Sequence, residues 1–140
     1  MHYLNCLDKV TNFEESKKIL KDKGLVIKEY GDLYLVKYRK DKSDMKNEDV
    51  QKCRGIILEK NSNKLLCVPP KKSIDNDYYH NEYKHGDFSE NVIFEEFIDG
   101  TMINVFKFNN NIYISTRSCL GANCRWNSEN TFNILFNECI

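Results

Sequence analysis

The strongest strand signal in the chain is the stretch Cys53-Arg54-Gly55-Ile56-Ile57-Leu58-Glu59. Its centre is continuously apolar, which is typical of a strand that is buried on both faces. A turn of Asn61, Ser62 and Asn63 follows, and residues 64–68 return as a second strand that ends at two prolines. The sequence therefore predicts an antiparallel strand pair in the middle of the chain.

Further antiparallel strands are predicted on both sides of this pair. Residues 25–30 and 33–39 form a hairpin across Gly31 and Asp32, and residues 92–98 form a strand that ends in an Asp-Gly turn. A last hairpin is predicted over residues 101–108 and 112–117. We predict a loop or one helical turn over residues 40–50 and a loop over residues 71–91.

One helix is predicted near each end of the chain. Thr11 or Asn12 can cap a helix over residues 12–20, and Ser128 can cap a final helix over residues 129–139. The apolar face of the final helix would hold Phe132, Leu135 and Phe136. A mostly antiparallel sheet with flanking helices is an α+β fold. The length, 140 residues, suits one domain over residues 1–140.

Composition excludes strong global attraction to nucleic acid or to an anionic membrane. Lys+Arg and Asp+Glu are both 21, so any contact with a phosphate must come from a local patch. No apolar run approaches ~18 residues, and the start of the chain lacks a signal-peptide pattern. We therefore expect a cytoplasmic protein without a membrane partner. None of the six cysteines forms a C-x-x-C pair, so we expect buried, reduced thiols and no metal site.

Three short stretches carry groups that could bind phosphate. The first is Arg54-Gly55, where glycine permits close backbone approach and arginine can make bidentate phosphate contacts. The second is the turn Asp99-Gly100-Thr101, which can place polar groups at a pocket rim. The third is Ser115-Thr116-Arg117-Ser118, where hydroxyls, backbone amides and a guanidinium can cradle an anion. Each stretch alone also fits a surface turn or a solvated loop.

The order and spacing of these stretches resemble the nucleotidyltransferase domain of the phage T4-type, ATP-dependent RNA ligases that repair tRNA. The Cys-Arg-Gly-Ile strand of that family is matched by residues 53–56, and its Lys-x-Asp-Gly-Ser/Thr motif is matched by Phe97-Ile98-Asp99-Gly100-Thr101. A later motif is matched loosely by residues 115–118, and a Lys-Phe-Phe-Asn stretch is matched poorly by residues 72–75. The resemblance covers roughly residues 33–137.

This resemblance implies a partial ATP-grasp-like nucleotidyltransferase domain of the RNA/DNA ligase type. In such a domain a lysine attacks the α-phosphate of ATP, AMP passes to an RNA 5′-phosphate, and a 3′-hydroxyl displaces AMP to seal the strand. ATP and Mg²⁺ are the implied cofactors. The residues that the resemblance implies for nucleotide and phosphate binding are Arg54, Gly55, Lys72, Asp99, Gly100, Thr101, Arg117 and Ser118.

The chain departs from this family at the residue that does the chemistry. Phe97 occupies the position of the nucleophilic lysine, and a phenyl ring has no lone pair with which to form a phosphoramidate. The two later motifs of the family would lie beyond Ile140. We therefore expect a catalytically impaired domain that binds ATP or RNA 5′-phosphate ends. The alternative is an active ATP-dependent RNA ligase that uses another lysine, such as Lys37, Lys71 or Lys72, or a second chain that completes the fold.

A non-enzymatic interaction module is the other alternative. The neutral net charge suits it, and so does the aromatic loop that contains Tyr78, Tyr79 and Tyr83 with His80 and His85. These rings could stack on unpaired bases, or they could pack against the sheet. The preference for lysine over arginine and the abundance of asparagine indicate an AT-rich genome, which suits a viral or phage-like origin.

Overall fold

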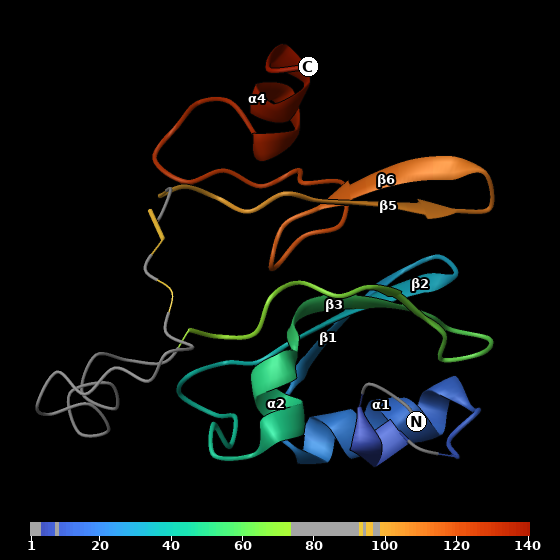
Figure 1. Cartoon of the computed structure of the whole chain (residues 1–140). Helices are drawn as coiled ribbons and strands as arrows, with labels where there is room; N and C mark the ends of the chain where they lie inside the picture. Colours follow the sequence, from blue (N-terminus) through green and yellow to red (C-terminus); the bar gives the residue numbers. More distant parts are fainter. Residues whose placement is uncertain (1–3, 8, 74–92, 94, 97–98) are drawn as a thin grey trace, which may run out of the picture.

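The computed structural model describes residues 4–7, 9–73, 93, 95–96 and 99–140, and it has an α+β fold (Figure 1). A four-stranded antiparallel sheet has the order β1-β2-β3-β4. A separate hairpin pairs β5 with β6. The strands are β1 (Val26–Tyr30), β2 (Leu33–Lys37), β3 (Arg54–Glu59), β4 (Leu65–Cys67), β5 (Asn104–Phe108) and β6 (Asn111–Ser115). The helices are η1 (Asn5–Leu7), α1 (Phe13–Asp22), α2 (Glu48–Lys52) and α4 (Phe132–Glu138).

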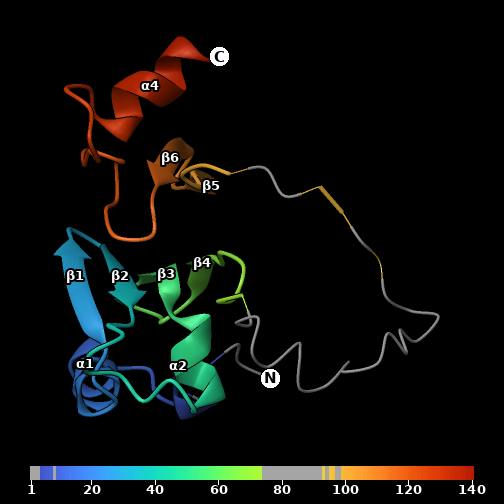
Figure 2. The same cartoon turned by 90° about the vertical axis from the view of Figure 1, so that its left-hand side faces the viewer.

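The elements form layers. Helices α1 and α2 cover one face of the four-stranded sheet, the β5–β6 hairpin lies over the other face, and α4 lies beyond the hairpin (Figures 1 and 2). The two faces of β2 and β3 are therefore both covered. Because successive side chains of a strand point to opposite faces of the sheet, neighbouring residues of β2 and β3 lie in different cores. This explains the continuous apolar runs in these strands.

The first core lies between the sheet and the helices. It takes Tyr34 and Val36 from β2 and Ile56 from β3, together with Leu20 from α1, and all four are 0% exposed. The Tyr34 hydroxyl is satisfied because it donates to Asn63 Oδ1 at 2.7 Å. Helix α1 starts as predicted, since Asn12 caps it by accepting from the N–H of Glu14 at 2.8 Å.

The second core lies between the sheet and the hairpin. Leu35 and Ile57 come from the sheet, and Phe106 comes from β5. Phe106 stacks on Tyr113 of the paired strand, with ring centroids 5.6 Å apart. Burial of each such side chain stabilises the fold by about 1.5–3 kcal/mol. This core holds the hairpin over the sheet and thereby sets the position of the loop that follows β6.

Several predicted elements differ from the structure. The stretch predicted as a loop or one helical turn ends in a helix of five residues, α2, which agrees with the second alternative but extends two residues past residue 50; Asn47 caps it by accepting from the N–H groups of Asp49 and Val50. The predicted strand over residues 92–98 is absent at its described residues, 93, 95 and 96, and the others lie outside the described residues. Strand β5 begins at Asn104 rather than at residue 101. The aromatic loop residues Tyr78, Tyr79, His80, Tyr83 and His85 also lie outside the described residues.

The final helix begins later than predicted. Thr131, not Ser128, caps α4 by accepting from the N–H of Ile134. The N–H of Phe132 donates to the carbonyl of Cys124, and that of Asn133 donates to the carbonyl of Ala122. The preceding loop therefore satisfies the first amides of α4, and this fixes where the helix can start.

The cysteines are only partly buried, contrary to the prediction. Cys53 and Cys67 are buried, whereas Cys139 is exposed and the other three are intermediate. All six thiols are free. Within the described ranges, no helix has the length and apolar character needed to cross a membrane.

Candidate functional site

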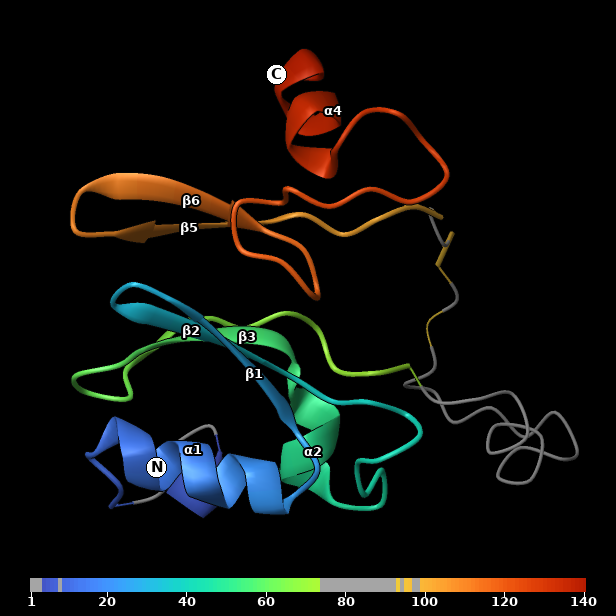
Figure 3. The same ribbon diagram turned by 180° about the vertical axis from the view of Figure 1, so that it is seen from behind.

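The loop that follows β6 turns away from the hairpin and reaches the four-stranded sheet (Figure 3). Thr116 closes a tight turn, because its N–H donates to the carbonyl of Cys119 at 2.9 Å and its Oγ1 accepts from the N–H of Ser118 at 3.3 Å. Lys28 of β1 donates from Nζ to the carbonyl of Ser118 at 2.7 Å. The first residues of the loop are thus held both by hydrogen bonds within the loop and by a hydrogen bond from the sheet.

Gly55 lets this loop approach β3. A Cβ at position 55 would lie 2.6 Å from the carbonyl oxygen of Arg117 and 2.7 Å from its Cα. Gly55 also has φ of +95°, which side-chain-bearing residues rarely adopt. The predicted Arg-Gly stretch and the predicted Arg117 stretch are therefore in direct backbone contact.

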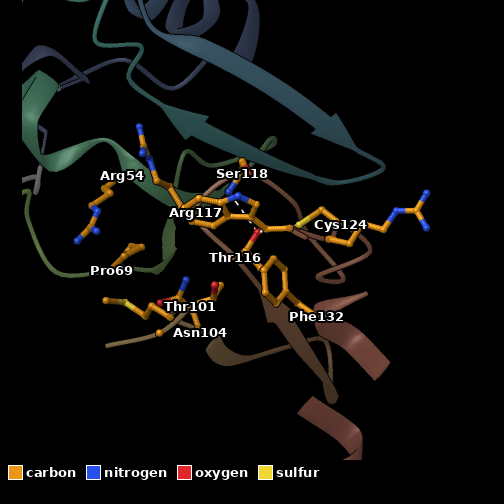
Figure 4. Close-up of a pocket in the computed structure, with 13 residues that line it drawn as sticks. Arg54, Pro69, Thr101, Asn104, Thr116, Arg117, Ser118, Cys124 and Phe132 are labelled. Atoms are coloured by element: carbon orange, nitrogen blue, oxygen red, sulfur yellow. Dashed lines mark hydrogen bonds between the residues drawn. The ribbon is translucent and has the colours of Figure 1, made fainter. Parts of the chain in front are cut away.

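A cavity of about 340 Å³ lies where β3, the segment before β5 and the loop after β6 meet (Figure 4). Among the described residues of its lining, arginine is the only charged residue type. The lining residues are Arg54, Pro69, Gly100, Thr101, Met102, Asn104, Thr116, Arg117, Ser118, Cys124, Arg125, Trp126 and Phe132.

The three arginines of the cavity have no carboxylate partner among the described residues. Arg54 Nη1 is 3.5 Å from the carbonyl of Lys71, and Arg125 Nη1 is 3.5 Å from the carbonyl of Glu129. The guanidinium of Arg117 lies 4.5 Å from the ring centroid of Tyr38, a cation–π contact that holds its charge in place without neutralising it. The cavity therefore presents fixed positive charge to an anion.

Aromatic side chains line the other part of the cavity. Trp126 is 76% exposed and Phe132, the first residue of α4, is half-buried. A large exposed indole beside arginines is the arrangement that stacks on a nucleobase. The lining thus combines groups for an anion with a flat apolar surface.

The structure brings most of the predicted residues together. Arg54, Gly100, Thr101, Arg117 and Ser118 line the cavity, and Gly55 lies behind the backbone of Arg117.

Two predicted residues are not in the lining. Asp99 caps its own turn, because its Oδ1 accepts from the N–H of Gly100 at 2.8 Å. Lys72 donates from Nζ to the carbonyl of Ser73 at 3.2 Å. Phe97 lies outside the described residues.

Sequence reasoning did not assign seven of the lining residues to a site, namely Pro69, Met102, Asn104, Cys124, Arg125, Trp126 and Phe132. The Arg125-Trp126 pair carried a signal, because an arginine next to an aromatic residue in a polar loop can bind a phosphate and a base together. Asn104 and Phe132 gave no such signal. They fitted an ordinary strand and an ordinary helix face, and only the folded chain places them at the cavity.

The described residues fit a nucleotide better than they fit a metal. Arginines, hydroxyls and an exposed indole can hold phosphates and a base. Protein-held Mg²⁺ uses one or two carboxylates, and the described part of the cavity lining contains none. No cluster of three or more potential metal ligands occurs in the part of the chain that the structure describes.

Comparisons with known proteins gave no match to this chain, whether with protein-family models, with curated proteins or with solved structures.

Proposed function

We propose that this chain is a partial ATP-grasp-like nucleotidyltransferase domain of the RNA-ligase type, and that its cavity binds ATP or an RNA 5′-phosphate end. The supporting observation is that three stretches far apart in the sequence meet at one cavity. Arg54, Thr101 and Arg117 belong to the three stretches that carry the resemblance to RNA ligases, and all three line this cavity.

In the proposed complex the phosphate lies between Arg54 and Arg117. Each charge-assisted hydrogen bond of this kind contributes roughly 1.5–3 kcal/mol. The hydroxyls of Thr101 and Ser118 lie at the same cavity and can donate to phosphate oxygens. The lining residues that the structure describes include no carboxylate, so none of them repels a bound anion.

The base of the nucleotide stacks on Trp126. Stacking of this kind supplies about 1–3 kcal/mol per base and tolerates any base. Recognition in the cavity therefore depends on phosphate charge and on the presence of an aromatic base more than on the identity of that base.

The domain binds without forming a covalent intermediate. Phe97 stands where the related ligases have their nucleophilic lysine, and a phenyl ring cannot attack the α-phosphate. Binding and covalent transfer are therefore separable in this protein, and each can be measured by itself.

The test is to titrate the chain with a fluorescent ATP analogue, and in parallel to incubate it with Mg²⁺ and ATP labelled at the α-phosphate. We expect saturable binding and no acid-labile covalent label. Arg117→Gln should weaken the binding about tenfold or more. Lys64→Gln is the matched control, since it removes one positive charge from an exposed position outside the cavity.

Two results would contradict the proposal in different ways. A folded chain that shows no saturable binding would favour the interaction module. An acid-labile label would mean that another lysine acts as the nucleophile and that the chain is an active adenylyltransferase.

A further inference from the structure

Two lysines lie on the face of the sheet that carries the arginine cavity. Lys37 follows Leu33 and Leu35 on β2, and both of these leucines point into the core beneath the hairpin. Lys28 shares its face of β1 with Tyr30, which packs against the same core. Alternation along β1 therefore directs Lys28 to the side of the sheet where the loop after β6 lies. The register of the β2–β3 ladder shifts between Val36 and Lys37, and the place of Lys37 on this side follows from its closeness to Lys28 and Arg117, whose charges act on it.

Pairing across the strands places Lys37 next to the cavity. Lys37 is the partner of Arg54 in the β2–β3 ladder. Lys28 is anchored to the cavity loop through its 2.7 Å hydrogen bond to the carbonyl of Ser118. Lys37 therefore lies close to Arg54 and Arg117, and Lys28 lies beside the loop that carries Arg117.

The charge of these two lysines is not balanced by the protein. Neither Lys28 nor Lys37 forms an ion pair with any carboxylate of the described residues. Burial, together with the charges of Lys28, Arg117 and Arg39, lowers the pKa of Lys37. Like charges held this close repel one another, and a bound anion would relieve the repulsion.

We propose that Lys37 and Lys28 form a second anion subsite that adjoins the arginine cavity, so that a ligand with a chain of phosphates occupies both. This inference rests on the proposed nucleotide binding and adds a substrate preference to it. A monophosphate fills the arginine cavity alone, and the outer phosphates of a nucleoside triphosphate reach Lys37.

The test compares the binding of AMP and ATP, both carrying the same fluorophore on the ribose, to the wild-type chain and to Lys37→Met. We expect the substitution to weaken ATP binding about tenfold and to change AMP binding less than twofold. Lys37→Arg keeps the charge and should retain most of the ATP affinity. Lys18→Met, on the exposed surface of α1, should leave both ligands unaffected.

A competition with inorganic tripolyphosphate completes the experiment. Tripolyphosphate should displace labelled ATP from the wild-type chain and should do so less effectively from Lys37→Met. If ATP binds and depends on Arg117 but not on Lys37, the second subsite is wrong while the proposed function stands. If the folded wild-type chain binds neither nucleotide, both proposals are wrong.

Discussion

The Cα of Gly55 faces the backbone of Arg117 so closely that a methyl group at position 55 would lie 2.6 Å from the Arg117 carbonyl oxygen. The contact is between two backbones, so no rotation of a side chain can relieve it. It joins the beginning of β3 to the loop after β6, and the candidate cavity exists because these two segments touch.

The first prediction concerns this contact. Gly55→Ala should destabilise the fold by at least about 2 kcal/mol, because it adds the strain of a positive φ to a clash with backbone atoms. Chemical unfolding in urea measures this loss. The same substitution should also abolish nucleotide binding if the loop is forced away from β3.

Gly31→Ala is the matched control for Gly55→Ala. Gly31 also has a positive φ, +57°, but nothing lies within 4 Å of the position of its Cβ. This substitution should cost only about 1–2 kcal/mol, which is the conformational penalty alone. Equal losses at the two glycines would show that the contact with Arg117 contributes nothing to stability.

The second prediction separates binding from stability. Arg54 makes one weak hydrogen bond, at 3.5 Å, and no ion pair with the described residues. Arg54→Ala should therefore leave the melting temperature nearly unchanged while weakening the binding of ATP about tenfold. Thermal unfolding and a binding titration of the same preparation give both quantities. A large drop in melting temperature would mean instead that Arg54 is structural.

The third prediction concerns pH. Asp49 is 7% exposed, and its carboxylate accepts from the N–H groups of Cys6 at 2.9 Å and Asn5 at 3.2 Å. Burial raises the pKa of Asp49, but these two hydrogen bonds and the adjacent Lys52 outweigh burial, and the pKa is lowered overall. Because the folded pKa lies below the unfolded one, the stabilisation is complete above the unfolded pKa of about 4 and is lost as pH falls through the folded value.

Asp49→Asn should therefore cost about 2 kcal/mol at pH 7 and clearly less at pH 3, as measured by urea unfolding at each pH. Asp44→Asn serves as the control, because Asp44 is exposed and the only hydrogen bond of its side chain among the described residues is from the nearby N–H of Lys46. A cost for Asp49→Asn that does not change between the two pH values would show that the charge of the carboxylate is unimportant.

The fourth prediction concerns thiol reactivity. Cys139 is exposed and should react first with iodoacetamide, whereas Cys53 is buried and should react only after unfolding. Cys6 should be slow at neutral pH, because burial and the neighbouring Asp49 raise its pKa to about 11. Mass spectrometry of peptides after timed alkylation gives the order. Rapid labelling of Cys53 in the native protein would contradict the packing of the first core.

Much of the sheet could be predicted because its strands carry local signals. The apolar run Ile56-Ile57-Leu58 and the turn at Gly31 and Asp32 lie where the structure has β3 and the β1–β2 turn. The start of α4 could not be predicted in this way. Its first amides are satisfied by the carbonyls of Cys124 and Ala122, and that pairing depends on how the loop folds.

Some residues of the candidate cavity could be named from the sequence. Gly55 and Arg117 were named because the order and spacing of their stretches resemble those of the RNA ligases, whereas each stretch alone also fits a surface turn or a solvated loop. Lys37 was named only as one of several lysines that could replace the nucleophile, because its charge environment comes from Lys28 and Arg117, which only the folded chain brings near. Long-range electrostatics is therefore the part of the site that the sequence leaves open.

The hydrogen bond between Lys28 and the carbonyl of Ser118 joins residues 90 positions apart. Strands β1 to β4, in contrast, pair in the order in which they occur in the chain, so each closes only a modest loop. From this difference in sequence separation we expect the sheet to form before the distant contact, because closing the longer loop costs more conformational entropy. The cavity would then be the last part of the molecule to assemble, and any ligand that fills it would slow unfolding more than it speeds folding.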